Sequence, residues 1–418
     1  MKKVPLLFLL FLTACGAGAV SEFGMRNDLA PRNKAGLRGA AASSKEYIAP
    51  RSLMEFSSRL ASEGRDLRQH GVYVESFETG EPIAMMNEDV LFNPASVMKL
   101  ATTLAALERL GPNQTFHTDF LGTGEILPAL GELTGDLILF SGRDPAFSIA
   151  DTKRVGEALR SLGIRQVAGS LVVIGDFSCN FKAERNESTE IFLKNLGVAF
   201  RGPVRYEPDG NPRGRVLVSV ESDSLLHIVQ YLNAHSVNSI ADLLAAHIGG
   251  TQSVKRILVE TAGLAPEDVR ISRASGLEVN RLSPRDTVKV LRALFDKLRR
   301  YDLDPQAVMA IAGVDAGTLA RRFTEREFAG SVIAKTGTLY TTDTGVAALA
   351  GVMHTRDRGD LLFAIYDSAQ YRRIQYLRNA QDDFLKALMN ECGGPAPSRE
   401  HSMTHNFDKL QSTVTIAE

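Results

Sequence analysis

The sequence predicts a fold of the α+β class with two core-forming domains. Three observations lead to this expectation: an apolar helical pattern over residues 94–110, strand-like runs concentrated after Gly330, and a different texture of short apolar strands and turns over residues 116–221. A chain of 418 residues is long enough to bury two cores. Its formal net charge of −1 argues against nucleic acid as a main partner.

Residues 1–15 are predicted to be a signal peptide rather than part of the fold. Two lysines precede an apolar run over residues 4–12, which is too short to span a bilayer but typical of a secretory signal. The run ends in Leu12-Thr13-Ala14-Cys15, which resembles the bacterial lipobox, whose cysteine becomes the lipid-modified first residue of the mature protein. Cleavage after the small residues 17–19 is the alternative, and it leaves a soluble exported protein.

Both alternatives predict export to the periplasm. Lipidation at Cys15 would anchor the protein, and because Gly16 is not the aspartate that retains lipoproteins in the inner membrane, the outer membrane is the expected location where the host has one. Export places Cys179 and Cys392 in an oxidising compartment, where they could form one disulfide or remain two thiols. No Cys or His spacing is typical of a metal site, so no metal is predicted.

The larger domain is predicted to begin after a tether. Residues 16–45 are rich in Gly, Ala and Ser without periodicity, which is typical of a flexible segment. From residue 46, helical spacing and then alternation predict a helix, a two-stranded hairpin and a second helix over residues 48–68, 71–77, 82–86 and 94–110. This first part of the larger domain is expected to end at residue 115.

Residues 116–221 are predicted to form a smaller inserted α+β domain, with strands over residues 137–140, 169–174 and 216–220 and a helix over residues 149–163. The larger domain is expected to resume over residues 222–392, with helices over 226–247, 254–262, 284–298 and 371–389 and strands over 331–337, 344–352 and 361–366. The polar, aperiodic residues 393–418 are predicted to be a disordered tail.

The helix over residues 94–110 places Ser96 and Lys99 on one face, because residues three apart are neighbours on a helix surface. A serine needs a base to become a nucleophile. A lysine can be that base only if burial or a nearby cation lowers its pKa, and an apolar helix supplies the burial. Alone, the pair favours a simpler interpretation, a capping-region serine beside a lysine that extends to solvent.

Two further motifs favour the catalytic interpretation. They are Ser236-Val237-Asn238, within a helical region, and Lys335-Thr336-Gly337-Thr338, on a predicted strand. The order Ser-x-x-Lys, Ser-x-Asn, Lys-Thr-Gly is the signature of penicillin-recognising serine enzymes. A second Ser-x-Asn at Ser178-Cys179-Asn180 is interpreted as accidental, because it follows a strand of the insert, whereas Ser236 leads into a core helix.

On these motifs the chain resembles the D-alanyl-D-alanine carboxypeptidase/endopeptidase family, the class C low-molecular-mass penicillin-binding proteins (peptidase S13 group). The similar stretches lie between about residue 48 and residue 390, at residues 93–99, 135–145, 163–169, 233–242, 275–277, 282–284 and 334–339. The resemblance implies a serine β-lactamase/transpeptidase-like domain, in which an antiparallel sheet is flanked by helices and interrupted by an insert.

Two departures from the family pattern stand out. The separation from Ser96 to Ser236 is shorter than in the larger members. Arg273-Ala-Ser-Gly-Leu277 stands where the family has Asp-Gly-Ser-Gly-Leu, which affects substrate contacts expected from that loop.

The resemblance implies a serine-type carboxypeptidase that forms an acyl-enzyme. Ser96 would attack the carbonyl of the penultimate D-alanine, and Lys99 would accept its proton. Lys335 would hold Lys99 deprotonated and attract the substrate carboxylate. Ser236 would relay a proton to the leaving amine, while Asn238 would orient Lys99 and a substrate amide.

The same resemblance implies the substrate contacts and partners. Thr336, Gly337 and Thr338 would bind the substrate, and the backbone N–H groups of Ser96 and Thr338 would form an oxyanion hole. The expected substrates are peptidoglycan peptides ending in D-Ala-D-Ala, with β-lactams as covalent inhibitors and no cofactor. Trimming of stem peptides, cutting of cross-links, or both remain open.

Two other functions compete with this interpretation. One is a catalytically inactive scaffold of the cell envelope; three intact motifs argue against it, since a binding module has no need of a buried lysine. The other is an esterase or β-lactamase on the same fold. The sequence has no obvious deacylating glutamate, which favours a peptidase.

Overall fold

The computed structural model describes residues 47–182, 184–368, 373–396 and 409–417. The predicted signal peptide over residues 1–15, with Cys15, and the predicted tether over residues 16–45 lie outside the described residues. We refer to residues 47–115 and 223–396 as the main domain and to residues 116–222 as the insert. The boundaries of the predicted domains remain a prediction.

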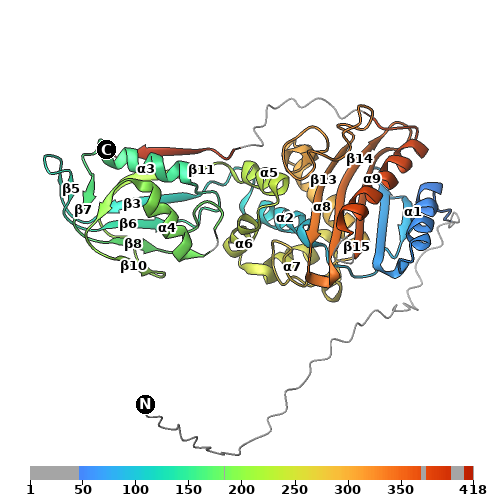
Figure 1. Ribbon diagram of the computed structural model, residues 1–418, viewed down its shortest axis with the longest axis horizontal. Coiled ribbons are helices and arrows are strands. Elements are labelled where there is room, and N and C mark those ends of the chain that lie inside the picture. The colour runs from blue at the N-terminus through green and yellow to red at the C-terminus, as the bar shows by residue number, and fades with distance from the viewer. Residues whose placement is uncertain (1–46, 183, 369–372, 397–408, 418) are drawn as a thin grey trace, which may run out of the picture. The chain divides into compact units, whose positions relative to one another are not determined.

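A six-stranded antiparallel sheet forms the centre of the main domain (Figure 1). In spatial order its strands are β12 (Ala310–Ile311), β13 (Val332–Leu339), β14 (Val346–Thr355), β15 (Gly359–Ser368), β1 (His70–Ser76) and β2 (Pro82–Met86). Strands β13 to β15 are joined by short turns, and β1 pairs with β15 so that Tyr73 lies opposite Ala364. The two halves of the main domain, separated by the insert in sequence, therefore share one sheet.

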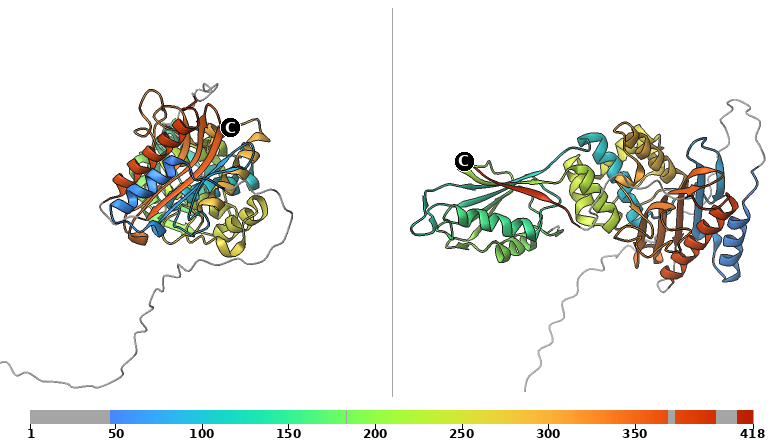
Figure 2. Two further views of the ribbon diagram at one scale, coloured as in Figure 1. Left: turned by 90° about the vertical axis from the view of Figure 1, so that its right-hand side faces the viewer. Right: turned by 90° about the horizontal axis from the view of Figure 1, so that it is seen from above.

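Helices cover both faces of this sheet (Figures 1 and 2). One face carries α1 (Arg51–Ser62) and α9 (Ile374–Glu391). The other carries α8 (Pro284–Arg299), which packs with a group of helices comprising α2 (Met98–Leu110), α5 (Leu225–His235), α6 (Asn238–His247) and α7 (Gly250–Ala262). Ala348 and Leu349 of β14 belong to different hydrophobic clusters, because successive side chains of a strand point to opposite faces.

Short 3₁₀ turns link several of these elements. They are η1 (Leu67–Gln69), η2 (Ala95–Val97), η3 (Pro266–Asp268), η4 (Pro305–Ala307) and η5 (Thr342–Thr344). The most important for function is η2, which lies directly before α2 and packs against β13 and β14.

The insert contains two sheets and two helices. One sheet has the order β10 (Val204–Glu207), β8 (Leu171–Ile174), β6 (Leu137–Ser141), β3 (His117–Gly122), β11 (Arg215–Ser222) and β16 (Ser412–Ile416). The other has the order β4 (Ile126–Leu127), β5 (Glu132–Leu133), β7 (Gln166–Val167) and β9 (Ala199–Phe200). Helices α3 (Ile149–Ser161) and α4 (Arg185–Leu196) pack together over a core that includes Phe120, Phe147 and Phe192.

Strand β16 corrects one prediction. Residues 393–418 were expected to form a disordered tail, but Ser412–Ile416 pairs antiparallel with β11 at the edge of the insert sheet. Val414 packs against the insert core, and Arg154 of α3 donates to the carbonyl of Ser412 at 2.6 Å. The β-branched residues of Ser412–Ile416 suit a strand. Their partner is the edge of β11, which lies far away in the sequence, so the pairing could not be predicted from the local pattern.

Both remaining cysteines are free thiols in buried positions. Cys179 lies in the core of the insert and Cys392 follows α9, so the structure favours the second of the two alternatives left open by the sequence. Within the described ranges, no helix has the length and apolarity needed to cross a bilayer. The mixed architecture of an antiparallel sheet flanked by helices confirms the predicted α+β class.

Candidate active site

Ser96 is the middle residue of the turn η2, which lies immediately before α2. The expected helix start at residue 94 is displaced, because Ala95 has a φ of 48° and the α-helix begins only at Met98. Asn93 holds the turn, since its Oδ1 accepts a hydrogen bond from the Ala95 N–H at 3.1 Å. The tight turn leaves the Ser96 hydroxyl only partly covered while its neighbours are buried.

Lys99 is fully buried and directed at Ser96. Its Nζ lies 2.9 Å from Ser96 Oγ, 2.7 Å from Asn238 Oδ1 and 2.6 Å from the carbonyl oxygen of Ser275. Burial lowers the pKa of Lys99 to about 7, and the nearby carboxylate of Asp242 opposes that shift. A substantial fraction of this amine is therefore neutral near pH 7, as a general base must be.

Ser236 and Asn238 lie where one predicted helix is interrupted. The sequence predicted a continuous helix over residues 226–247, but Ser236 adopts a left-handed φ of 59° between α5 and α6. The Val237 N–H still donates to the Leu232 carbonyl, so the chain turns without leaving that donor unpaired. The interruption directs Ser236 and Asn238 to the two lysines instead of placing them along one helix.

Lys335 lies on β13 and is also fully buried. Its Nζ donates to Ser236 Oγ at 3.0 Å and to the Thr336 carbonyl at 2.7 Å. Burial lowers the pKa of Lys335 well below its usual range, and repulsion from Lys99 lowers it further. Because two neighbouring ammonium groups repel each other, the two lysines together favour no more than one positive charge.

The remaining predicted residues lie on the same strand. A Cβ atom on Gly337 would be 2.7 Å from the Pro94 carbonyl oxygen, so glycine allows β13 to approach the turn that carries Ser96. Thr336 Oγ1 donates to Thr318 Oγ1 at 2.8 Å, and Thr338 Oγ1 accepts a hydrogen bond from Arg378. Strand β12 pairs with β13 only at Ile333 and Ala334, which leaves that edge beyond Ala334 without a paired strand among the described residues.

Direct contacts join Lys99 to Ser96 and Asn238, and Lys335 to Ser236, and the charge of Lys99 acts on Lys335. Thr336, Gly337 and Thr338 follow Lys335 on β13. Cys15 lies outside the described residues. The sequence analysis missed the support beneath Lys99. Asp242 accepts a hydrogen bond from the Ser275 N–H at 2.9 Å and pairs with Arg273 at 2.7 Å, which orients the Ser275 carbonyl. The spacing of Asp242 four residues after Asn238 on a helix was the available signal.

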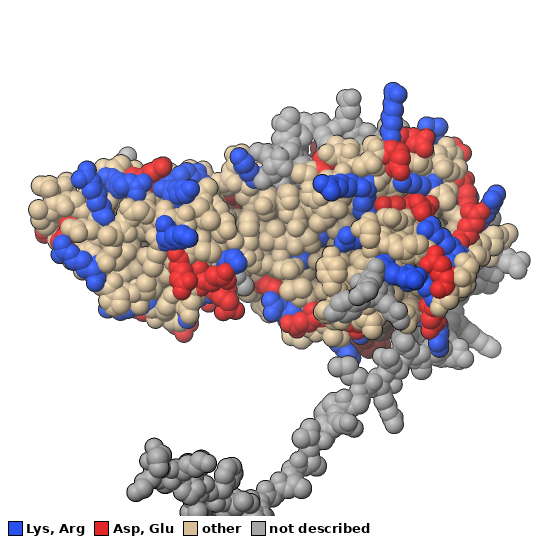
Figure 3. Space-filling model, in the orientation of Figure 1, with Lys and Arg blue, Asp and Glu red and all other residues tan. Residues whose placement is uncertain are grey.

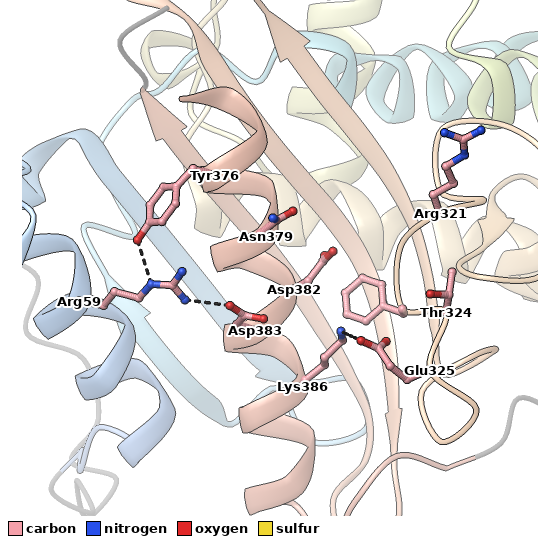
Figure 4. A pocket seen from close by; sticks show the side chains of 10 residues that line it. Arg59, Arg321, Thr324, Glu325, Tyr376, Asn379, Asp382, Asp383 and Lys386 are labelled. Carbon is pink, nitrogen blue, oxygen red and sulfur yellow. Dashed lines mark hydrogen bonds and ion pairs between the residues drawn. The ribbon is translucent and has the colours of Figure 1, made fainter. Parts of the chain in front are cut away.

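A separate hollow lies on the opposite face of the sheet, among α1, α9 and residues 321–325 (Figure 4). Its volume is about 350 Å³, and its charged side chains largely pair with one another. Arg59 donates to Asp383 at 2.8 Å, and Lys386 donates to Glu325 at 2.5 Å. It contains neither the serines nor the lysines of the three motifs, so we place the candidate active site at Ser96.

The surface charge agrees with the composition. On the face shown in Figure 3, basic and acidic side chains are interspersed on both the insert and the main domain. Proteins that bind nucleic acid generally concentrate positive charge along the binding surface. In the described ranges, no group of three or more His, Cys, Asp or Glu side chains is arranged to hold a metal ion.

A model of the D-Ala-D-Ala carboxypeptidase 3 (S13) family matches residues 54–189 and 180–388. The chain belongs to this family. An S13 assignment agrees with the family that the three motifs indicated, so that prediction is confirmed. A D-alanyl-D-alanine carboxypeptidase of Actinomadura sp. (strain R39) is 35% identical over 101 residues, which are 24% of this chain and 18% of that protein. The match thus spans less than a fifth of the curated relative.

Two solved structures resemble the S13 chain along most of its length. The predatory endopeptidase Bd0816 of Bdellovibrio bacteriovorus, in complex with an immunity protein, has a TM-score of 0.69 at 20% identity, covering 82% of this chain and 99% of that one. Penicillin binding protein 4 of Haemophilus influenzae has a TM-score of 0.62 at 21% identity, covering 77% and 96%. These likenesses confirm the predicted fold.

Proposed function

We propose that this protein is a serine-type D-Ala-D-Ala carboxypeptidase that acts on peptidoglycan stem peptides through an acyl-enzyme on Ser96. One observation carries the proposal: a buried lysine whose pKa is lowered to about 7 lies 2.9 Å from the hydroxyl of Ser96. A buried amine is costly in a protein that only binds, because burial disfavours the charged form. A serine nucleophile needs an adjacent general base, and a neutral lysine in hydrogen-bonding distance can supply it.

The reaction follows from these contacts. Ser96 Oγ forms a bond to the carbonyl carbon of the penultimate D-alanine while its proton passes to Lys99. The carbon–nitrogen bond then breaks, and the proton held by Lys99 passes through the hydroxyl of Ser236, which lies 3.0 Å from Lys335 Nζ, to the departing amine of the terminal D-alanine. Water then gives a proton to the neutral Lys99 and attacks the ester. The shortened peptide leaves as its acid, and Lys99 returns the proton to Ser96 Oγ.

Substrate binding would settle which lysine carries the positive charge. Asp242 favours charge on Lys99, whereas a substrate carboxylate near Lys335 would favour charge on Lys335. The repulsion between the two amines would then lower the pKa of Lys99 further. The substrate thereby helps to deprotonate the base that activates Ser96.

The oxyanion would form between the strand and the turn. We assign its stabilisation to the backbone N–H groups of Ser96 and Thr338, with Gly337 allowing the close approach of β13 to residues 94 and 95. Removing one such donor in a serine hydrolase lowers the rate by about 10²–10³-fold. No metal or organic cofactor takes part in the proposed steps.

Covalent labelling by a fluorescent penicillin tests the nucleophile. The wild-type protein should be labelled, and Ser96→Ala should lose all labelling because no hydroxyl remains to open the β-lactam ring. Ser178→Ala is the matched control, since Ser178 belongs to the second Ser-x-Asn sequence and its hydroxyl donates to the Lys182 carbonyl within the insert. Folded wild-type protein without label would instead support the inactive scaffold.

Product analysis separates the enzymatic alternatives. Release of D-alanine from a peptide ending in D-Ala-D-Ala supports the carboxypeptidase, whereas rapid nitrocefin turnover without that release supports an esterase or β-lactamase. Two solved relatives are named as predatory endopeptidases, one of them of peptidoglycan. Mass spectrometry of purified muropeptides after incubation therefore also measures the cutting of cross-links.

We also propose that the protein is exported and lipid-anchored through Cys15, facing peptidoglycan in the periplasm. The support is the run Leu12-Thr13-Ala14-Cys15 after an apolar segment. In cells fed a labelled fatty acid, the wild-type protein should carry the label and fractionate with membranes. Cys15→Ser should lose both properties while Cys392→Ser retains them. An unlabelled wild-type protein in the soluble fraction would favour ordinary cleavage after residues 17–19.

A further inference from the structure

Arg378 extends from α9 to the end of the strand that carries Lys335. Its guanidinium donates a hydrogen bond to the hydroxyl of Thr338, the last residue of the Lys-Thr-Gly-Thr motif. Arg378 is half-buried, and so is Thr338. The contact therefore connects helix α9 with the end of the motif on β13.

Arg378 forms no ion pair with a carboxylate in the part of the chain that the structure describes. The acid beside it, Asp382, accepts a hydrogen bond from Arg322 Nε at 2.8 Å and a second from the same guanidinium. Burial and the charge of Arg322 both lower the pKa of Arg378. Asp382 and Tyr340 oppose that shift, but neither pairs directly with the Arg378 guanidinium among the described residues, so an anion bound next to it would be stabilised.

The position of Thr338 indicates which anion. In the proposed reaction the leaving D-amino acid would lie along the edge of β13 that has no paired strand beyond Ala334 among the described residues. Its α-carboxylate would then lie near Lys335 and the motif threonines. An arginine binds a carboxylate through two parallel N–H groups, and it remains charged throughout the physiological pH range. Lys335 competes with Lys99 for positive charge, because the charge of Lys99 lowers the pKa of Lys335.

We propose that Arg378 is a specificity-determining residue that, together with Thr338, holds the α-carboxylate of the leaving D-amino acid. The inference rests on the proposed function and deepens it. Both a terminal D-alanine and a cross-linked D-centre present a carboxylate at that position. A substrate without this negative charge loses the interaction and is selected against.

Two synthetic peptides test the proposal, one ending in D-Ala-D-Ala with a free carboxylate and the same peptide as its C-terminal carboxamide. The wild-type enzyme should prefer the free acid. In Arg378→Ala, kcat/KM for the acid should fall about 10–100-fold, mainly through KM, because a charge-assisted contact is lost. The carboxamide should be little affected, and Arg378→Lys should recover part of the preference.

Arg373→Ala is the matched control, because Arg373 is exposed and directly precedes the same helix. The Arg373→Ala enzyme should prefer the free acid as strongly as the wild type does. Equal losses on both peptides in Arg378→Ala would overturn the inference, since they would mean that Arg378 only supports Thr338. A wild type inactive on both peptides would overturn the carboxypeptidase function instead. The role of Arg378 would then be tested by comparing the acylation rates with penicillin G and with its methyl ester, of which the free acid should react faster in the wild type than in Arg378→Ala. Absence of acylation by both compounds would overturn both proposals.

Discussion

Replacing Lys99 by methionine is expected to lower the rate constant for acylation by penicillin about 10²–10⁴-fold, the contribution typical of a general base. Methionine matches the length of the lysine stem and keeps the core of α2 filled, but it has no group that accepts the serine proton. The variant should nevertheless fold, because it removes an amine that burial disfavours. Stopped-flow acylation and thermal unfolding measure the two effects.

Lys297→Met is the control for this substitution. Lys297 is also largely buried, but its Nζ pairs with Glu108 at 3.0 Å, away from Ser96. Its acylation rate should equal that of the wild type. Acylation of Lys99→Met within tenfold of the wild type would contradict the role of Lys99.

The wild-type acylation rate should rise as pH rises through about 7, because the lowered pKa of Lys99 makes the neutral base available above that pH.

Replacing Gly276 by alanine is expected to damage both the fold and the site. Gly276 has a φ of 85°, and a Cβ atom there would lie 1.9 Å from the Ala95 carbonyl oxygen. A strained backbone together with forced repacking costs about 2–5 kcal/mol of unfolding free energy. Because the turn carrying Ser96 must shift, acylation should also slow about 10²-fold. Chemical denaturation and acylation kinetics measure these changes.

Gly263→Ala separates the clash from the conformational strain. Gly263 also has a positive φ, 64°, but nothing lies within 4 Å of the added Cβ position. Its stability should fall by only about 1 kcal/mol, and its acylation rate should not change. If Gly276→Ala acylates as fast as this control, the contact between residues 276 and 95 does not position the nucleophile.

Strongly patterned elements were predicted well because local physics determines them. The hairpin strand over residues 82–86 and the helix that Ser283 caps before Pro284 both have the predicted start, since alternation and capping are read from neighbouring residues. Helix α4 was missed. Its sequence, Arg185–Leu196, is mostly polar, and only a few side chains such as Phe192 contact the insert core. A long-range contact, not local propensity, stabilises it.

The candidate site shows the same division. Residue types and their order were enough to select Ser96, Lys99, Ser236 and Lys335, because each motif is short and contiguous. The spacing of Asp242 from Asn238 could have placed Asp242 near the site, but its contact with Ser275 was not predictable, since the two residues are separated by 33 positions and meet only in the folded protein. Arg273, one of the departures from the family pattern, donates to the second oxygen of that carboxylate.

By itself, the sequence determined the class of fold, the family and the chemical groups of the site, because these depend on periodicity and on short motifs. Only the tertiary structure decided where the polypeptide must leave regular helix, at Ala95 and Ser236, and which distant groups surround the two lysines. The reason is physical: the pKa of a buried amine depends on its surroundings in three dimensions, to which segments far apart along the chain contribute.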